Sequence, residues 1–269
     1  KDFYRHRLIT VEPVENSFGQ QWARNVLLKS IHCGSLSGTI MDGFCGSLRS
    51  KSITYENRQA DLQRERCLYA SDTGCLATLD LSDASDSISF ECFASAFPSW
   101  VVALCERFRT PYFSSNDEKH ELRIYAGMGN ATTFVIETLY FWAAMTAIQE
   151  WLHLDRFGVT VFGDDIIADV RAANHPLFES ECRRFGFILN PDKCGLSVSP
   201  GFREACGLCA VNGQSLADLI RIPGYCVDTT GGLIDFCNLI SRLLNSTVLA
   251  HQVLGYELWD ENPKIPSIP

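Results

Sequence analysis

Short apolar runs and one long apolar stretch dominate the middle of the chain. Residues 76–79 form a short apolar run after a polar region, which is typical of a buried strand. The stretch from about 132 to 151 is apolar nearly all round and follows a Gly-rich turn, so it predicts a buried helix. Apolar residues at 159–162 and 166–168 flank Gly163-Asp164-Asp165 and predict a β-hairpin with carboxylates at its tip.

Capping residues and prolines mark further elements. Ser85-Asp86-Ser87 is expected to open a helix whose apolar residues share one face, and Pro98 to end it. Asn16 is expected to cap an earlier helix that runs to Leu28. The other expected elements are a basic strand at 7–11, a short helix near 58–68, a helix at 174–185, a strand at 186–190, a strand pair at 201–211 and a last helix at 233–249. Strands and helices are thus interleaved.

The chain is long enough and apolar enough to bury a core. It has 269 residues, of which 46% are hydrophobic and 20% are charged. The longest apolar block, 139–148, is too short to cross a bilayer, which excludes a membrane-spanning protein. The first residue is Lys1, and no charged start with an apolar signal core follows it. We therefore interpret the sequence as a fragment or a processed piece.

Charge is distributed unevenly along the sequence. The formal net charge of −9 argues against phosphate binding by the chain as a whole. Residues 1–70 nevertheless carry ten Lys and Arg against seven Asp and Glu, whereas residues 71–269 carry thirteen against twenty-five. The acidic part is either a solvated surface or includes carboxylates that hold divalent metal ions.

Twelve cysteines are many for this length. Without a signal peptide or a framework of paired spacings, they indicate free thiols in a reducing compartment, mostly as small core residues. Cys206 and Cys209 form the one compact pair, which would suit a redox dithiol or half of a zinc site. A thiol or zinc-binding interaction protein is therefore an alternative, although no second pair completes a tetrahedral ligand set.

Three acidic residues stand at the ends of predicted strands. Asp80 follows the strand at 76–79, and Asp164 and Asp165 occupy the hairpin tip. Neighbouring carboxylates repel one another unless cations neutralise them, and hard oxygen ligands favour Mg²⁺ or Mn²⁺. An isolated Gly-Asp-Asp is more often an ordinary turn, so the interpretation depends on the rest of the sequence.

The surrounding segments supply that context. The runs Asp80 to Ser89, Met128 to Phe134 with Glu137, and Val161 to Ile166 resemble motifs A, B and C of viral polymerases. More narrowly, they are similar to the replicase catalytic subunit of the levivirus group of single-stranded RNA bacteriophages, including the Ser-Asp-Ser-Ile-Ser run around Asp86.

Three further segments extend this resemblance from residue 7 to about residue 221. Residues 7–13, with Asn16 and Gln20, resemble the basic finger strand called motif F. Residues of motif D and motif E follow the hairpin in the family's order. They are Gly186, Phe187, Asn190 and Lys193 for motif D, and 201–207 for motif E.

The resemblance implies an α+β fold with the architecture of a right-hand polymerase. Residues 1–75 would form partial fingers with the basic motif F strand. Residues 76–211 would form a palm of antiparallel strands backed by helices, with a finger-like insertion near 107–126. Residues 212–269 would form a helical thumb. Phage replicase subunits are longer chains, so the resemblance also implies that the amino-terminal part is truncated.

The resemblance also assigns metal-binding and catalytic roles. Asp80, Asp164 and Asp165 would hold two Mg²⁺ ions, with Mn²⁺ able to substitute, for transfer of a nucleotidyl group to a 3′-hydroxyl. Lys193 would protonate the leaving pyrophosphate or steady the triphosphate, although a surface lysine is an equal alternative.

Nucleotide binding is implied for a second set of residues. Asp86 would accept a hydrogen bond from the ribose 2′-hydroxyl, and Asn130 would share this contact. The alternatives are a helix cap for Asp86 and a loop for Asn130. The full nucleotide-binding set is Arg5, Arg7, Asp86, Gly129, Asn130 and Thr133. Asp83 and Glu137 depart from the broader viral pattern, and their roles stay open.

The implied activity is RNA-directed RNA synthesis that replicates a single-stranded RNA viral genome in the cytoplasm of an infected bacterium. The partners would be template and product RNA and nucleoside triphosphates, together with host elongation factors Tu and Ts and a ribosomal protein. No membrane is expected. A reverse transcriptase or a nucleotidyl cyclase is the alternative among enzymes, because both use a palm with paired aspartates.

Overall fold

The computed structural model describes residues 9, 11–32, 55–115, 118–154, 159–216, 230–245 and 249–260. The chain divides into two compact units, Lys1–Gln214 and Ser215–Pro269. Most of the expected basic strand at 7–11 lies outside the described residues. The candidate residues Arg5 and Arg7 lie wholly outside them.

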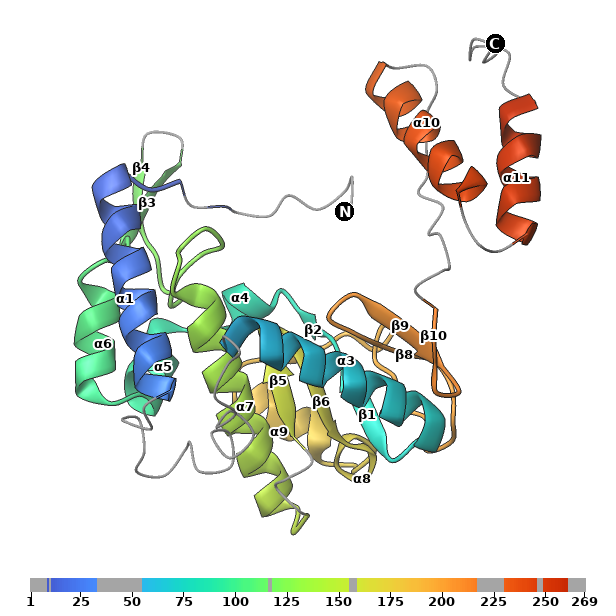
Figure 1. The fold of residues 1–269 in the computed structure, drawn as a ribbon. Coiled ribbons are helices and arrows are strands. Elements are labelled where there is room, and N and C mark those ends of the chain that lie inside the picture. The colour runs from blue at the N-terminus through green and yellow to red at the C-terminus, as the bar shows by residue number, and fades with distance from the viewer. Residues whose placement is uncertain are drawn as a thin grey trace. The chain divides into compact units, whose positions relative to one another are not determined.

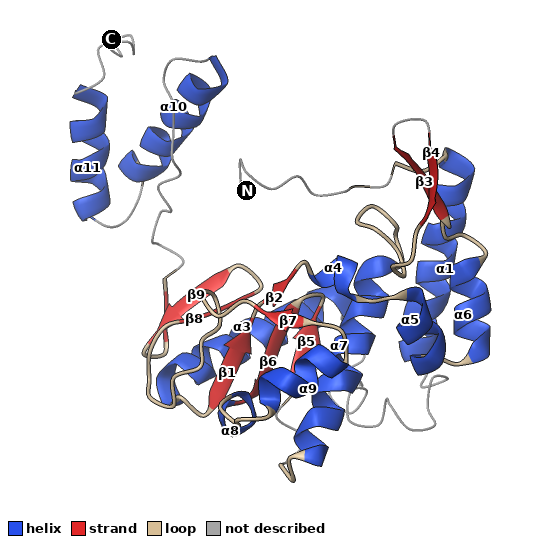
Figure 2. Cartoon of the chain, turned by 180° about the vertical axis from the view of Figure 1, so that it is seen from behind, coloured by secondary structure: helices blue, strands red, loops and turns tan. Residues whose placement is uncertain are grey.

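A three-stranded antiparallel sheet is the centre of the first unit. Its order is β1 (Leu76–Leu79), β6 (Asp165–Asp169) and β5 (Thr160–Phe162), as the red strands in Figure 2 show. The register pairs Leu79 with Ile166 and Phe162 with Asp165. The predicted strand at 76–79 and the predicted hairpin at 159–168 are confirmed. Because β1 runs antiparallel to β6, the end of β1 lies beside the start of β6.

Helices lie on both faces of this sheet. α3 (Tyr55–Thr73) covers one face, and α9 (Phe178–Arg184) lies on the other face, as the opposite views of Figures 1 and 2 show. α7 (Thr133–Trp151) packs against β5, β6 and α9, and most of its side chains are buried. The nearly all-apolar pattern therefore predicted α7 correctly, because the helix is enclosed on several sides.

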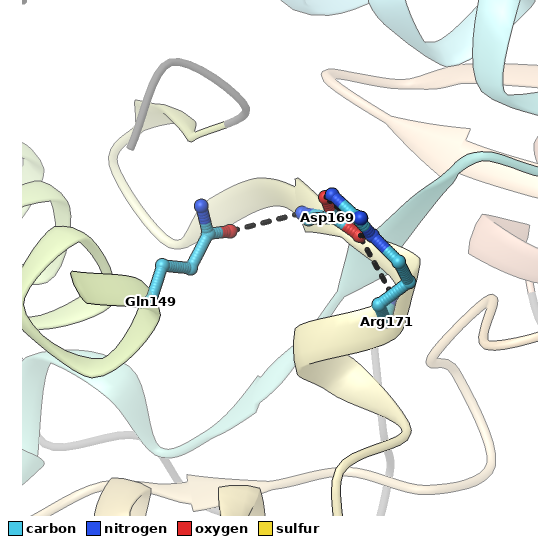
Figure 3. Close-up of polar contacts among 3 residues, drawn as sticks. All are labelled: Gln149, Asp169 and Arg171. Carbon is cyan, nitrogen blue, oxygen red and sulfur yellow. Dashed lines mark hydrogen bonds and ion pairs between the residues drawn. The ribbon is translucent and has the colours of Figure 1, made fainter. Parts of the chain in front are cut away.

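Polar contacts fix the end of β6 that lies away from its acidic start. Figure 3 shows Gln149 of α7 accepting a hydrogen bond from the backbone N–H of Asp169, at 3.0 Å. The Asp169 carboxylate in turn pairs with Arg171 at 2.6 Å and caps α8 (Val170–Ala173). Gln149 is fully buried, so its amide satisfies a backbone donor that water cannot reach.

The expected single helix from 85 to Pro98 is wrong, because local capping interrupts it. The structure has α4 (Ala84–Ser87) and α5 (Phe90–Ala96), and the Ser89 hydroxyl caps α5 by accepting a hydrogen bond from the N–H of Cys92 at 3.1 Å. Pro98 then precedes α6 (Ser99–Glu106). Ser89 has extended backbone angles, which suit an N-cap but not a helix interior.

Other boundaries also differ from the prediction. α1 (Val14–His32) begins directly after Pro13, so Asn16 lies inside the helix and donates its amide hydrogen to Glu12 rather than capping the helix. α3 is longer than the expected 58–68. The expected helix at 174–185 is confirmed only as the shorter α9, and α8, which ends before residue 174, was not predicted. Pro176 lies between the two helices, where its missing N–H prevents a continuous helix.

Short strands complete the first unit. β2 (Leu81–Ser82) pairs with β7 (Ile188–Leu189), which is shorter than the expected strand at 186–190. The region 107–126 contains a hairpin of β3 (Tyr112–Ser115) and β4 (Glu118–Glu121). The predicted strand pair at 201–211 is confirmed as β8 (Arg203–Ala205) and β9 (Leu208–Val211), next to β10 (Gln214–Ser215).

The second unit contains α10 (Thr230–Leu244) and α11 (Leu249–Asp260). The expected last helix at 233–249 corresponds to α10, and α11 was not predicted. Phe236 and Ile240 are buried in the small core of this unit. No helix in the described part of the chain is both long and apolar enough to cross a membrane.

Arg203 joins β8 to the central sheet from a buried position. Its side chain is 1% exposed, and its guanidinium donates to the backbone carbonyls of Leu76 at 3.2 Å, Phe202 at 2.8 Å and Ser197. A charge at this depth is tolerated because several acceptors surround it. The position of Arg203 in a predicted strand did not indicate this role.

We expect Arg203→Met to lower the free energy of unfolding by at least about 2 kcal/mol, because Arg203 makes three hydrogen bonds from a buried position and the buried Leu76 carbonyl loses its donor. Urea denaturation of the chain measures this loss. Arg171→Met is the control, since the Arg171 side chain is 66% exposed and its replacement should cost less than about 1 kcal/mol. Equal losses for the two variants would contradict the role of Arg203.

Candidate active site

The structure brings Asp80, Asp164 and Asp165 to one end of the central sheet. Asp80 directly follows β1, and Asp165 begins β6, so the β1–β6 register places them beside each other. Asp164 lies in the turn that joins β5 to β6. The three carboxylates come from two segments more than 80 residues apart in sequence, and strand pairing alone assembles them.

The turn before Asp164 can only be made by glycine. Gly163 has φ +64°, and a Cβ atom added there would lie 2.3 Å from the Phe134 ring. Its N–H donates to Thr138 Oγ1 of α7 at 2.8 Å. Phe134 also contacts Phe162 edge to face, with ring centroids 4.7 Å apart. α7 therefore holds the hairpin tip against its own first turns.

Asp80 has two polar partners from the segment that follows β7. The Asn190 amide donates to Asp80 Oδ2 at 3.1 Å, and Lys193 Nζ lies 3.7 Å from the same oxygen. The backbone N–H of Asp80 donates to the thiol sulfur of Cys194 at 3.4 Å. The structure therefore places the predicted catalytic Lys193 beside Asp80, in a pair that is partly exposed to solvent.

Asp165 is the most enclosed of the three acids. Burial raises the pKa of its carboxyl most, hydrogen bonds from the backbone N–H and thiol of Cys206 oppose this rise, and the charges of Asp164 and Asp80 add to it. The mutual effect of the three carboxylates is repulsive, as expected for like charges with little water between them.

Two glutamines of α3 hold this hairpin from the other side, and sequence reasoning missed them. Gln59 donates to the carbonyl of Val161 at 2.9 Å, and Gln63 donates to the carbonyl of Asp165 at 2.7 Å. Both side chains are buried. Their spacing of four residues within an expected helix was the available signal, because it places them on one face.

Glu137 is buried beside the acidic cluster. Burial raises its pKa to about 8, and the charges of Asp164 and Asp86 contribute to the rise. Its Oε1 atom has no hydrogen-bond partner among the described residues. Burial at this position therefore favours the protonated form of the Glu137 carboxyl.

The remaining nucleotide-binding candidates lie around the starts of α4 and α7. Asp86 is exposed in the first turn of α4, close enough to Glu137 to affect its charge. Asn130 Oδ1 accepts hydrogen bonds from the N–H and hydroxyl of Thr132, at 2.9 and 2.7 Å. Thr133 donates its hydroxyl to Gly127. The Asn130 oxygen thus organises the turn before α7.

Backbone conformation explains the residue type at two positions in these turns. Gly129 has φ +108°, which an L-amino acid rarely adopts. Asp83, whose role the sequence left open, has φ 52° and ψ 48° just before α4. Asp is among the few residues that tolerate this left-handed conformation, so Asp83 has a conformational role at the entrance to α4.

The donor atoms of Asp80, Asp164 and Asp165 determine which cations this end of the sheet could bind. Within the described part of the chain, no three acidic, cysteine or histidine side chains are gathered closely enough to hold a metal ion. Asp80 instead contacts Lys193 and Asn190. Hard carboxylate oxygens that repel one another nevertheless suit Mg²⁺ or Mn²⁺.

Cys206 and Cys209 have different charged neighbours. Asp165 and Asp164 raise the pKa of the Cys206 thiol, whereas Cys209 acts on the pKa of Cys67. The nine cysteines in the described segments are free thiols. These contacts disfavour the zinc-binding alternative, since the two thiols have different neighbours.

The fold and the acidic sheet end define the class of a right-hand polymerase palm. A crystal structure of the RNA-dependent RNA polymerase of a human picobirnavirus, an insertion-loop deletion mutant, matches 95% of this chain and 53% of its own, with a TM-score of 0.55 and 14% identity. The expected α+β palm fold is confirmed.

The family follows from sequence comparison. The model of the family described as "RNA replicase, beta-chain" matches residues 45–243, and the chain belongs to this family. It is 34% identical over 160 residues to the RNA-directed RNA polymerase beta chain of Escherichia phage MS2. It is 32% identical over 203 residues to the RNA-directed RNA polymerase subunit beta of Escherichia virus Qbeta.

These matches cover 59% and 75% of this chain but only 28% and 30% of the two relatives. The chain therefore spans about a third of the length of such relatives. Membership of this family favours an RNA polymerase over the reverse transcriptase and cyclase alternatives.

We expect Glu137→Gln to stabilise the metal-free chain more at pH 8 than at pH 5. The folded-state pKa of Glu137 is about 8 against an ordinary value of 4.5, so the stability contributed by this group is fully present below about pH 4.5 and is lost as the pH rises through 8. Glutamine removes this loss. Thermal melting in a chelator should show a gain of at least about 2 °C at pH 8.

The control for this measurement is Glu91→Gln, which changes an exposed glutamate of α5 and should shift the melting temperature equally at both pH values. A Glu137→Gln effect that does not grow between pH 5 and pH 8 would contradict the buried, protonated state of Glu137.

Proposed function

We propose that this chain carries the palm active site of an RNA-directed RNA polymerase that replicates a single-stranded RNA viral genome. The observation that carries the proposal is the meeting of Asp80, Asp164 and Asp165 at one sheet end in a member of the RNA replicase beta-chain family. The MS2 and Qbeta relatives are named as RNA-directed RNA polymerases, which supports the same activity here.

The proposed cofactor is Mg²⁺, with Mn²⁺ able to substitute. Asp80 and Asp164, together with Asp165, would hold two such ions through carboxylate oxygens. When bound, divalent ions activate the attacking 3′-hydroxyl and offset the charge that develops on the pyrophosphate leaving group. The repulsion within the ligand-free cluster supports this proposal, because cations would relieve it.

In this proposal, Lys193 and Asn190 act on the carboxylate of Asp80. Asn190 orients one carboxylate oxygen through its amide, and Lys193 supplies a cation at the same oxygen. A flexible lysine at this position can also reach the triphosphate, steady its charge or give a proton to the leaving pyrophosphate.

The proposed nucleotide pocket lies between α4 and the start of α7. Asp86 would accept a hydrogen bond from the ribose 2′-hydroxyl, and its closeness to Glu137 supports a polar site there. Asn130 and Thr133 would shape the adjoining turn, and Gly129 would allow close approach of the substrate. Arg5 and Arg7 would neutralise the triphosphate.

The proposed partners are template and product RNA and nucleoside triphosphates. By resemblance to the phage replicases, host elongation factors Tu and Ts and a ribosomal protein are further proposed partners. The proposed location is the cytoplasm of an infected bacterium.

We expect Asp80→Asn and Asp164→Asn each to lower nucleotide incorporation at least about a thousandfold, because each removes a metal-binding charge. Asp165→Asn should cost less, since Asp165 is less exposed than Asp164. The assay is primer extension by an active polymerase that contains this chain, with folding checked by circular dichroism. Parent-level turnover by Asp164→Asn would refute the proposed function.

We expect Asp86→Ala to weaken discrimination between ribonucleotides and 2′-deoxyribonucleotides more than it slows incorporation of ribonucleotides. A polar group that pairs with a substrate hydroxyl penalises the analogue without it. The measurement is the ratio of kcat/KM for the two sugars. Asp83→Asn, which changes a nearby exposed acid, should leave this ratio unchanged. An unchanged ratio in Asp86→Ala would contradict the contact with the 2′-hydroxyl and would leave Asp86 only as an acidic residue at the start of a helix.

A further inference from the structure

The turn before α7 contains a threonine whose hydroxyl does not cap the helix. Thr132 occupies the N-cap position of α7, where a threonine side chain usually accepts a hydrogen bond from a backbone N–H of the first turn. Its side chain makes no such bond. The hydroxyl instead donates to Asn130 Oδ1 at 2.7 Å, and the backbone N–H of Thr132 donates to the same oxygen at 2.9 Å. Thr132 therefore directs two donors at Asn130.

These two bonds fix the orientation of the Asn130 side-chain amide. A backbone N–H can only donate, so the atom that it meets must be the amide oxygen and not the amide nitrogen. An amide oxygen has two lone pairs, and both are used here. The amide nitrogen of Asn130 makes no hydrogen bond within the described part of the chain. Asn130 can therefore offer a bound molecule donors but not its oxygen.

A buried tyrosine begins this chain of hydrogen bonds. Tyr125 is 2% exposed, and its hydroxyl oxygen lies 2.7 Å from Thr132 Oγ1. A hydroxyl group has one hydrogen, and that of Thr132 is committed to Asn130, so Tyr125 must be the donor to Thr132. The hydrogen bonds thus run in one direction, from Tyr125 through Thr132 to Asn130. Consecutive hydrogen bonds with the same direction polarise and strengthen one another.

The backbone of Tyr125 is held against the segment that carries Asp86. Its N–H donates to the carbonyl of Ile88 at 2.7 Å, two residues after Asp86. Its carbonyl accepts a hydrogen bond from Nε of the Arg109 guanidinium. Tyr125 therefore connects the segment that bears Asp86 with the turn that bears Asn130, although the two are more than 40 residues apart in sequence.

We propose that Tyr125 and Thr132 are positioning residues that make Asn130 present its amide N–H groups to an acceptor on the sugar of the incoming nucleotide. This inference rests on the proposed function, in which Asp86 and Asn130 both contact the ribose 2′-hydroxyl. A carboxylate only accepts, so the 2′-hydroxyl would donate its hydrogen to Asp86 and accept a hydrogen bond from Asn130 on its oxygen. An Asn130 oxygen turned toward the sugar would instead compete with Asp86 for that one hydrogen.

Two substitutions at Thr132 separate positioning from structure. Thr132→Val keeps the shape of the side chain and removes its hydroxyl, whereas Thr132→Ser keeps the hydroxyl. In an active polymerase that contains this chain, Thr132→Val should lower the ratio of kcat/KM for ribonucleotides over 2′-deoxyribonucleotides about tenfold, mainly through a loss for the ribonucleotide. Thr132→Ser should stay within about twofold of the parent ratio. Circular dichroism checks that both variants fold.

Substitutions of tyrosine test the direction of the chain. Tyr125→Phe should lower the same ratio about threefold, because Thr132 can still reach Asn130 but has lost the donor that holds its hydroxyl. In a Thr132→Val background, Tyr125→Phe should lower the ratio no further, because the chain is already broken. The matched control is Tyr140→Phe, which removes another buried hydroxyl, one that donates to the carbonyl of Phe185 at 2.9 Å. It should leave the ratio at the parent value.

Each result assigns a cause. If Thr132→Val lowers kcat/KM equally for both sugars, or if Thr132→Ser fails to keep the ratio, Thr132 is only structural and the inference is overturned. Equal changes of the ratio in Tyr125→Phe and Tyr140→Phe would also overturn it. If Asp164→Asn abolishes synthesis while the ratio stays at the parent value in every Thr132 and Tyr125 variant, the inference fails and the proposed function stands. If Asp164→Asn keeps parent turnover, the proposed function itself fails.

Discussion

Like charges held side by side raise the free energy of a folded chain. The carboxylates of Asp80, Asp164 and Asp165 lie together in this way at one end of the central sheet. Strand pairing brings them together, so the cost cannot be avoided without changing the β1–β6 register. The contacts around the cluster limit it. Lys193 supplies a cation to Asp80, and the Asn190 amide donates a hydrogen bond to the same oxygen. A divalent cation would offset the remaining repulsion.

The surrounding elements hold this sheet end in place through buried polar contacts rather than through apolar packing alone. α3 reaches the β5–β6 hairpin with Gln59 and Gln63, and α7 reaches its turn with Thr138. Arg203 joins β8 to β1. Each of these side chains satisfies a backbone group of a strand that bears or adjoins an acidic residue. Such buried hydrogen bonds favour one arrangement, since any other would leave a donor or acceptor unpaired.

Much of the palm was predictable because its signals are local. The apolar runs of β1, β5 and β6 and the long apolar stretch of α7 each lie within one segment, and they predicted the correct elements. The break at Ser89 was missed because a cap preference competed with apolar periodicity. The role of Arg203 was not predictable, because it depends on contacts with residues far away in sequence. The contact between Lys193 and Asp80 was not predicted either, because the resemblance assigned Lys193 only to the pyrophosphate or the triphosphate.

The most direct test of the account is the stoichiometry and affinity of Mn²⁺ bound by this chain, measured by electron paramagnetic resonance at physiological salt. The account predicts saturable binding at the acidic sheet end that is lost in both Asp80→Asn and Asp164→Asn. Asp61→Asn, which removes an exposed acid of α3 paired with Arg64, should leave binding unchanged. Mn²⁺ binding that is the same in all four proteins would contradict the claim that these carboxylates form a cation site.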